Sequence, residues 1–537
     1  MTQTSLSPAD PTQGAWEVLP FNSEVLPVHA ALLHTGKVLF AAGSGNNHAR
    51  FTDRDFGNTS KGNWTSVVWD PSVTPGGGDS SFFHPDTLRG MGNNPQDRPI
   101  DFFCGGESFL ADGTLLSAGG TLDYDTGHGF FGRRATVAFN PNPNKQHWSQ
   151  QGDLSVGRWY PTLVTLGDGR VLAVAGLDQN GKIDQGAKSV EVFSPSTGSW
   201  KSLGVPAGPG FDRLPLYAHL FLLQDGRLLF SGGRMDDGVA QGPALLDLTT
   251  SPVRATTLGD LDQPDLRNQS ASVLLPPAQA QRVMIIGGGP GKDTDPRPAT
   301  NSVAVIDLTA AQPAFHPTAP LHSSRVHLNA TLLPDRTVLV TGGASQHENN
   351  ELGIAEQPGQ ARRQAEIYDP STDSWRAVAS AVVARMYHSV ALLLPDGRVV
   401  TAGNNPSKGQ HVAWNQDPDH EEMRLEIYSP PYLFRGSRPV ITSVPHEWRY
   451  GQTVQVQSPQ AQGSKWASLI KSGVTTHSFD TGQRLVDVPI DASRRVDSLA
   501  VHVPDNPNIA PPGWYMLFLA DQDGVPSVAT WINLQAA

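Results

Sequence analysis

The sequence predicts an all-β protein: a seven-bladed kelch-type β-propeller followed by a C-terminal immunoglobulin-like β-sandwich. Three observations lead to this prediction. A pattern of two apolar strands around a tight turn recurs seven times, glycine and proline are abundant at 54 and 44 of 537 residues, and the pattern stops near residue 435. Such a composition is typical of many short strands joined by turns.

Each repeat consists of an apolar strand, a turn with Asp-Gly or a variant, a second apolar strand and a closing glycine. The copies are LLHTGKVLFAAG (32–43), FLADGTLLSAGG (109–120), TLGDGRVLAVAG (165–176), LLQDGRLLFSGG (222–233), LLPPAQAQRVMIIGGG (274–289), LLPDRTVLVTGG (332–343) and LLPDGRVVTAG (393–403). From Gly120 to Gly403 the closing glycines follow at intervals of 55 to 60 residues, and an insertion over 44–100 lengthens the first interval. Asp-Gly between apolar runs signals a hairpin. A period near 50 without helical periodicity indicates propeller blades.

Two domains follow from where the repeat ends. Residues 1–436 are expected to form the propeller, with residues 1–25 supplying a strand that closes the ring. Residues 437–537 contain short alternating strands such as QTVQVQS and SVATWINL, separated by proline and glycine. About 100 residues of this pattern predict a β-sandwich.

The composition excludes two classes of partner. The net charge is −12 and no basic run exceeds two adjacent residues, which argues against nucleic acid. No apolar stretch approaches the ~18 residues of a membrane span. We expect a monomer that binds small molecules.

Chemically distinctive residues share one position in the repeat. Counted from the aspartate of the hairpin turn, or from its equivalent, these residues each stand eight positions earlier: Cys104, Tyr160, Tyr217, His327 and His388. Residues at one register of the innermost strands lie at equal height around the channel of a propeller. A thiol, phenols and imidazoles should therefore converge at one end of the channel, with Tyr387 beside them.

Such a set of side chains suggests a transition-metal site. Imidazole with oxygen donors favours Cu(II) over zinc, whose sites more usually show several cysteines or histidine with carboxylates. Two alternatives remain open from the residues alone. Cys104, the single cysteine, has the properties of an inert buried thiol, and tyrosines and histidines can simply line a wet channel in a propeller that acts as a binding scaffold without metal.

Four motifs and the tail of the chain resemble the galactose oxidase and glyoxal oxidase family of copper radical oxidases. The motifs are DFFCGGESFLADG, GRWYPTLVTLGDG, RMYHSVALLLPDGR and THSFDTGQR, and the tail is PPGWYMLFLADQDGVPSVATWINL. The resemblance implies a thioether crosslink between Cys104 and Tyr160 that becomes a protein radical. It also implies a copper ion bound by Tyr160, Tyr387, His388 and His477, with His477 reaching the metal from the C-terminal domain.

The resemblance further implies oxidation by O2 with release of H2O2. In the family Tyr387 would take the substrate hydroxyl proton, and the Tyr160 radical would take a hydrogen from the substrate carbon. The chain lacks the carbohydrate-binding N-terminal domain of galactose oxidases, which favours small aldehydes of the glyoxal, methylglyoxal or glycolaldehyde type, oxidised as hydrates to carboxylic acids. The alternative is a primary-alcohol oxidase of galactose or aryl-alcohol type. Tyr217 and His327 are the predicted substrate contacts, together with Phe103 and Trp159.

One departure from the family concerns the tryptophan that often stacks on the crosslinked tyrosine. Trp159 adjoins Tyr160, but neighbouring residues of a strand point to opposite faces, so Trp159 is expected to point away. Phe103, Phe130 or Phe131 would then take its place.

The location of the protein is not determined by these features. The first fifteen residues are polar and lack a hydrophobic signal region, so the chain is cytoplasmic or a leader has been removed. Scarce cytoplasmic copper and the harm done by peroxide favour an extracytoplasmic or secreted enzyme.

Overall fold

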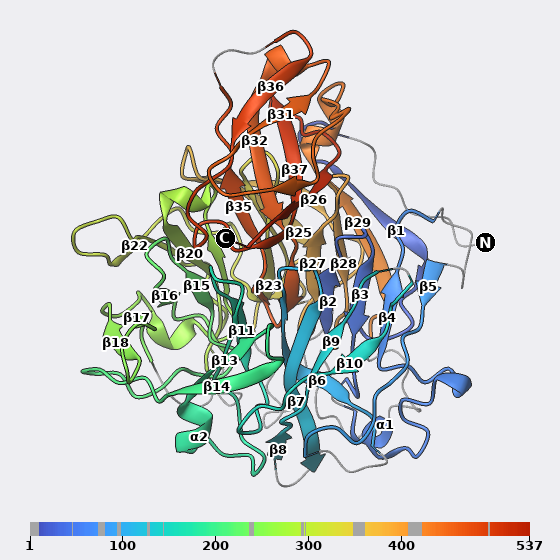
Figure 1. Cartoon of the computed structure of the whole chain (residues 1–537), viewed down its shortest axis with the longest axis vertical. Coiled ribbons are helices and arrows are strands. Elements are labelled where there is room, and N and C mark those ends of the chain that lie inside the picture. The colour runs from blue at the N-terminus through green and yellow to red at the C-terminus, as the bar shows by residue number, and fades with distance from the viewer. Residues whose placement is uncertain are drawn as a thin grey trace.

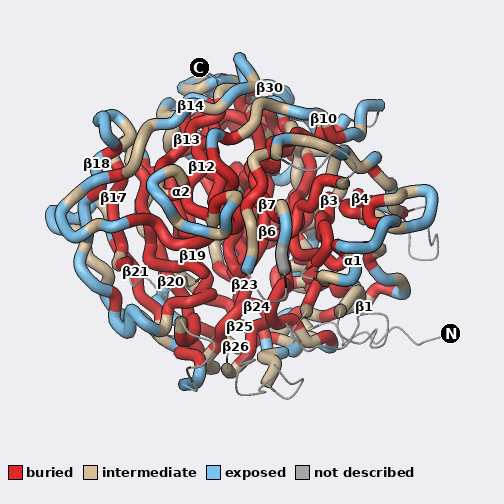
Figure 2. Tube along the Cα trace, turned by 90° about the horizontal axis from the view of Figure 1, so that it is seen from below, coloured by how far each residue is buried: buried red, intermediate tan, exposed pale blue. Residues whose placement is uncertain are grey.

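The computed structural model confirms the all-β fold class. It describes residues 10–536 apart from residues 46, 74–80, 94–97, 126–128, 143, 236–240, 292–294, 296, 347–359, 406–420 and 492–494. Within these ranges seven sheets of four or more strands surround a central axis, seen end-on in Figure 2 with buried residues toward the middle and exposed ones at the rim.

Innermost strands of neighbouring sheets lie against one another around the ring, in the pairs β6–β11, β11–β15, β19–β23, β23–β27 and β27–β2. These strands are buried on both faces because blades pack against each other face to face. The innermost strands are β2 (His29–Leu32), β6 (Asp101–Phe109), β11 (Thr162–Thr165), β15 (Leu220–Leu222), β19 (Ala271–Leu274), β23 (Val326–Leu332) and β27 (Val390–Leu393).

The outer strands of each blade continue the same antiparallel order. The second strands are β3 (Val38–Ala41), β7 (Leu115–Asp125), β12 (Val171–Val174), β16 (Leu228–Phe230), β20 (Arg282–Ile286), β24 (Val338–Ala344) and β28 (Val399–Ala402). The third strands are β4 (Ser66–Trp69), β9 (Thr136–Phe139), β13 (Val190–Ser194), β17 (Ala244–Asp247), β21 (Val303–Asp307), β25 (Gln364–Asp369) and β29 (Arg424–Ser429).

The outermost strands include one from the far end of the chain. They are β5 (Phe82–Phe83), β10 (Trp148–Gln150), β14 (Ser199–Gly204), β18 (Arg254–Thr257), β22 (Phe315–Pro317), β26 (Ser374–Ser380) and β1 (Ala15–Asn22), while β8 (Gly129–Gly132) also pairs with β7. Strand β1 pairs with β29 of the last blade, with Ala15 opposite Ser429. The N-terminal segment therefore closes the ring, as predicted.

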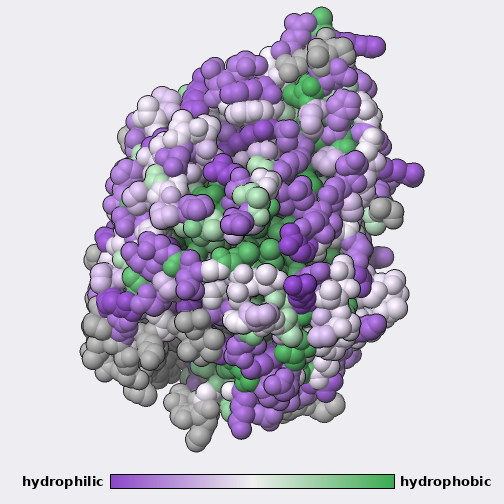
Figure 3. Space-filling view, turned by 90° about the vertical axis from the view of Figure 1, so that its left-hand side faces the viewer, coloured by the Kyte–Doolittle hydropathy of each residue, from purple (hydrophilic) through white to green (hydrophobic). Residues whose placement is uncertain are grey.

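Helices are short and lie in the connections. They are α1 (His48–Thr52) and α2 (Gln185–Lys188), with 3-10 turns at Thr59–Lys61, Pro264–Leu266, Ala278–Ala280, Pro431–Phe434 and Ala461–Gly463. In the part of the chain that the structure describes, no helix is long and apolar enough to cross a membrane. Hydrophilic side chains cover most of the flank in Figure 3, and apolar ones show mainly in the recessed middle of that face.

A buried arginine stands two or three residues before the aligned position in four blades. Each donates a hydrogen bond to a carbonyl at or beside the closing glycine of its own blade: Arg158 to Ala175, Arg267 to Gly287, Arg325 to Gly342 and Arg385 to Gly403, at 2.7–3.0 Å. Buried backbone carbonyls need such partners. In these four blades the arginine therefore fixes the start of the innermost strand, which is the segment that carries the predicted site.

The C-terminal segment forms a two-sheet sandwich above the propeller, drawn in orange and red in Figure 1. Its strands are β30 (Glu447–Trp448), β31 (Thr453–Gln457), β32 (Ser464–Lys471), β35 (Arg484–Asp487), β36 (Ser498–His502), β37 (Gly513–Asp521) and β38 (Thr530–Leu534). Its hairpin of β33 (Val474–Thr476) and β34 (Phe479–Asp480) leaves the sandwich and joins the propeller, where β33 pairs with β2.

Candidate metal centre

The aligned residues lie together at the start of the innermost strands. The Tyr160 backbone N–H donates to the Cys104 carbonyl at 2.9 Å, and the Tyr217 N–H donates to the Tyr160 carbonyl at 3.0 Å. The His327 N–H donates in the same way to the Gln269 carbonyl at 3.0 Å. Hydrogen bonds from blade to blade thus join residues far apart in sequence into an arc around the channel, so the predicted convergence is present.

These residues share an unusual backbone conformation. Their φ angles are positive: 61° at Cys104, 67° at Tyr160, 42° at Tyr217, 63° at His327 and 62° at His388. Non-glycine residues rarely adopt this region, and it costs on the order of 1–3 kcal/mol at each position. Strain of this kind concentrates at functional sites, and it turns each side chain away from the regular alternation of a strand.

Two phenols meet at the centre of the group. The Tyr160 and Tyr387 hydroxyl oxygens are 2.9 Å apart, and one donates a hydrogen bond to the other. Burial raises the pKa of Tyr160 well above its usual value, and the Cys104 thiol and the Tyr387 phenol beside it raise the pKa further. The Tyr160 phenol therefore favours the neutral form in the protein alone, and a nearby cation would favour its phenolate.

Trp159 stacks on Tyr160, so the expectation that it points away is wrong. The ring centroids are 3.7 Å apart and the planes are inclined by 24°. The alternation rule fails because Tyr160 has a left-handed φ and precedes the first residue of β11. Phe130 in turn stacks on the indole of Trp159, with ring centroids 4.2 Å apart and planes inclined by 14°. Phe130 thus forms a second aromatic layer.

The other predicted substitutes for this tryptophan lie elsewhere. Phe103 packs edge-on against His388, with centroids 5.5 Å apart and planes at 82°. Phe131 lies on β8 and is partly exposed. Phe103 therefore supports an imidazole rather than covering Tyr160.

Two imidazoles flank the phenols. His388 stacks on Tyr387 with centroids 3.7 Å apart, and His477 meets His388 edge to face at 4.8 Å. The His477 ring also lies 5.0 Å from the Tyr160 ring. His477 comes from the turn between β33 and β34, so the hairpin from the sandwich completes the group inside the propeller channel.

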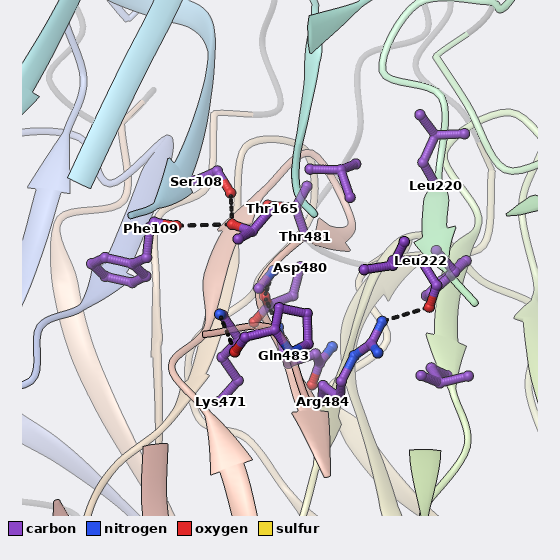
Figure 4. Close-up of a pocket in the computed structure, with 15 residues that line it drawn as sticks. Ser108, Phe109, Thr165, Leu220, Leu222, Lys471, Asp480, Thr481, Gln483 and Arg484 are labelled. Carbon is purple, nitrogen blue, oxygen red and sulfur yellow. Dashed lines mark hydrogen bonds between the residues drawn. The ribbon is translucent and has the colours of Figure 1, made fainter. Parts of the chain in front are cut away.

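The hairpin is anchored to the propeller on several sides. An oxygen of Asp480 accepts hydrogen bonds from the N–H groups of Val474, Gly482 and Gln483 at 2.9 Å each, which holds the turn. The following residues bind different blades: Thr481 donates to the Glu107 carbonyl, Gln483 to that of Ala330 and Arg484 to that of Leu222. Figure 4 shows Asp480, Thr481, Gln483 and Arg484 around a cavity of about 30 Å³ that Lys471 also lines.

Tyr217 and His327, the predicted substrate contacts, also belong to the group. The Tyr217 ring lies 4.5 Å from that of Tyr160, and its hydroxyl donates to the Gly105 carbonyl at 2.6 Å. The His327 ring lies 5.1 Å from that of Tyr387. Both side chains are buried in this structure. The Tyr217 hydroxyl is therefore engaged with the strand that carries Cys104.

A buried contact between a histidine and a carboxylate beside the group was not predicted. His29 Nδ1 lies 2.9 Å from a carboxylate oxygen of Glu107, and the His29 ring lies 6.1 Å from that of His477. Ser117 donates to the other oxygen of Glu107. The pair joins strands β2 and β6 of different blades, and no spacing in the sequence indicates it.

Tyr160, Tyr387, His388 and His477 supply two phenol oxygens and two imidazoles in one buried place. Nitrogen and oxygen donors of this kind suit Cu(II) in a tetragonal arrangement, so the residues fit the implied metal. Among the described residues no group of three or more His, Cys, Asp and Glu side chains could hold a metal ion.

Comparison with known proteins gives one consistent relationship. Residues 95–432 match the family described as glyoxal oxidase N-terminus, and residues 438–534 match the galactose oxidase-like early set domain. The aldehyde oxidase GLOX of Vitis pseudoreticulata is 31% identical over 82% of this chain and 84% of its own length. A galactose oxidase of Gibberella zeae is 27% identical over 81% of this chain and 61% of its own length.

The fold has a solved counterpart. A fungal alcohol oxidase of the AA5 family, solved in complex with copper, superposes with a TM-score of 0.74 over 99% of both chains at 22% identity. At this identity the likeness concerns the fold. The family match over most of the chain and the 31% identity to an aldehyde oxidase show that the chain belongs to the glyoxal oxidase and galactose oxidase family of copper radical oxidases and is an oxidoreductase.

Proposed function

We propose that this oxidase converts small aldehydes, taken as their hydrates, to carboxylic acids and reduces O2 to H2O2. The reaction RCH(OH)2 + O2 → RCOOH + H2O2 balances, because the two hydrogens lost by the hydrate reduce the oxygen. The observation that carries this proposal is the pairing of the Tyr160 and Tyr387 hydroxyls at 2.9 Å, between two imidazoles and beside Cys104. The proposed substrates are small aldehydes of the glyoxal, methylglyoxal or glycolaldehyde type.

Four side chains would hold one copper ion: Tyr160, Tyr387, His388 and His477. Bound copper supplies one of the two one-electron carriers that oxidation by O2 requires, and the modified tyrosine supplies the other. In this proposal residues 1–436 form the propeller, residues 437–537 form the sandwich that provides His477, and the enzyme works as a monomer.

The chain's own residues would divide the remaining work. Cys104 sulfur bonds to a ring carbon of Tyr160; the thiol hydrogen and one ring hydrogen are lost, with O2 as their acceptor. The sulfur then delocalises the unpaired electron of the oxidised Tyr160, and Trp159 covers the ring. The Tyr387 oxygen, as the phenolate that a bound copper ion would favour, would take the proton of a substrate hydroxyl. The Tyr160 radical takes a hydrogen from the substrate carbon.

Intact mass spectrometry tests the crosslink. Protein purified without copper and then exposed to copper and air should lose two hydrogens, and the Cys104→Ser variant should keep its mass. A copper-loaded wild type of unchanged mass would rule out the radical mechanism. Copper-loaded protein that releases no peroxide from any aldehyde or alcohol would rule out the proposed activity.

A primary-alcohol oxidase is the second candidate, because a galactose oxidase is among the relatives. The aldehyde oxidase relative is 31% identical to this chain and the galactose oxidase 27%, which favours aldehydes. Peroxide release from glyoxal, methylglyoxal, glycolaldehyde, galactose and benzyl alcohol, compared as kcat/KM, separates the two. Higher values for galactose or benzyl alcohol than for every aldehyde would favour the alcohol oxidase.

A further inference from the structure

Thr476 lies between the first blade of the propeller and the imidazole of His477. Its hydroxyl oxygen is 2.9 Å from the backbone carbonyl of Val28 and 2.7 Å from His477 Nδ1. Val28, Thr476 and His477 are all buried. One hydroxyl thus joins the propeller backbone to a side chain that the C-terminal segment supplies.

The two hydrogen bonds of Thr476 determine where its hydroxyl hydrogen and the imidazole hydrogen of His477 lie. A threonine hydroxyl has a single hydrogen to donate, and a carbonyl can only accept. The Thr476 hydrogen therefore goes to the Val28 carbonyl, and toward His477 the Thr476 oxygen acts as an acceptor. Nδ1 of His477 must then carry the imidazole hydrogen, which leaves the lone pair on Nε2. A metal binds the imidazole nitrogen that carries the lone pair, and the bond made by the other nitrogen decides which one that is.

The hydroxyl is held in a rigid frame. Thr476 is the last residue of β33, where its backbone stands opposite His29 of β2. The next turn is held by Asp480, which accepts three backbone N–H groups. The Thr476 oxygen therefore cannot follow a rotating imidazole, and the imidazole adjusts to the oxygen.

We propose that Thr476 is a positioning residue that fixes the tautomer and ring orientation of His477, so that Nε2 is the nitrogen presented to copper. This inference rests on the copper site proposed above. Removing such an outer partner of a metal-binding histidine typically weakens metal affinity by about 10–100-fold. We expect a loss in this range for Thr476→Val and recovery to within about threefold of wild type for Thr476→Ser.

The experiment compares copper affinity with a spectroscopic signature of the remote imidazole nitrogen. Wild type, Thr476→Val, Thr476→Ser and the control Thr475→Val, which removes the neighbouring buried hydroxyl, are titrated with Cu(II). Pulsed EPR then measures the couplings of the uncoordinated nitrogens. One of two remote-nitrogen signals should shift in Thr476→Val alone. Equal affinity and identical couplings in wild type and Thr476→Val would overturn the inference.

A measurement on wild type covers the case in which Thr476→Val does not fold. In metal-free protein labelled with ¹⁵N at histidine, long-range ¹H–¹⁵N spectra report the tautomer of each ring, and His477→Gln identifies the signals of His477. A proton on Nδ1 is expected, and a proton on Nε2 alone would overturn the inference. Wild type that shows no imidazole couplings to Cu(II) would instead contradict the copper site itself.

Discussion

The indole of Trp159 lies face to face with the phenol of Tyr160, with ring centroids 3.7 Å apart. Consecutive residues overlap in this way because Tyr160 has a φ of +67°. Phe130 covers the far face of the indole at 4.2 Å. Tyr160 therefore lies beneath two aromatic layers, both supplied by the second and third blades.

Replacing Trp159 tests what this stack does. An aromatic pair contributes about 0.5–1.5 kcal/mol beyond its buried area, so loss of the pair in Trp159→Leu should speed decay of the oxidised Tyr160 by about 3–10-fold. The mass loss of two hydrogens should persist, because Cys104 and Tyr160 are unchanged. Decay is followed by the optical and EPR signals of the oxidised enzyme. Trp159→Phe keeps a ring in place and should decay more slowly than Trp159→Leu; equal decay in wild type and both variants would contradict a protective stack.

The sequence predicted correctly those side-chain positions that depend on the repeat register. It failed for positions that depend on the local backbone conformation. The common offset from the hairpin turn predicted that Cys104, Tyr160 and His388 converge, because blades repeat the same path. Trp159 was misplaced because strand alternation assumes a negative φ, and no pattern of non-glycine residues signals the left-handed value at Tyr160. The His29–Glu107 pair joins two blades through side chains alone, which a single sequence does not reveal.

The Tyr217 hydroxyl bond predicts a structural role for that residue. It donates to the Gly105 carbonyl at 2.6 Å, beside Cys104. Tyr217→Phe leaves that buried carbonyl without this donor and should cost about 1–3 kcal/mol of unfolding free energy. Tyr217→Phe should also lower the fraction of protein that is crosslinked after a fixed time of copper exposure. KM for the preferred aldehyde should change by less than about twofold, which corresponds to under ~0.4 kcal/mol.

Tyr515 supplies the matched control for Tyr217. Its hydroxyl also donates to a buried carbonyl at 2.6 Å, that of Pro511, but within the sandwich. Tyr515→Phe should lose a similar unfolding free energy and form the crosslink at the wild-type rate. A tenfold rise in KM for Tyr217→Phe, with normal crosslinking, would instead assign Tyr217 to substrate binding.

The buried Arg158–Glu191 pair should dominate the stability of the third blade. The two groups are 2.9 Å apart and both side chains are fully buried. Arg158→Met leaves the Glu191 carboxylate buried without its cation, a change that typically costs about 3–5 kcal/mol. Urea unfolding measures the loss, and Arg158→Met combined with Glu191→Gln should recover part of it.

An exposed pair in the same blade provides the comparison for Arg158. Arg170 and Asp168 are 2.7 Å apart, but about half of each side chain is exposed. Arg170→Met should change the unfolding free energy by less than about 1 kcal/mol. A loss for Arg170→Met as large as that for Arg158→Met would show that burial does not set the strength of these pairs.

Lys471 predicts a pH dependence of stability. Burial, with a further contribution from the nearby Arg484, lowers the pKa of Lys471 from 10.5 to about 7. Between these two pH values Lys471 carries a proton in the unfolded chain but not in the folded chain. The contribution of Lys471 to the free energy of unfolding therefore increases as pH rises from about 7 to 10, by at most ~1.4 kcal/mol per pH unit. Lys471→Met should remove this slope while losing the bonds to the Pro511 and Pro512 carbonyls. Urea unfolding of wild type and Lys471→Met at pH 7, 8, 9 and 10 gives a plot of unfolding free energy against pH for each protein. The difference between the two plots isolates the effect of Lys471, because the other titrating groups are common to both proteins. Parallel plots would show that Lys471 stays protonated in the folded protein.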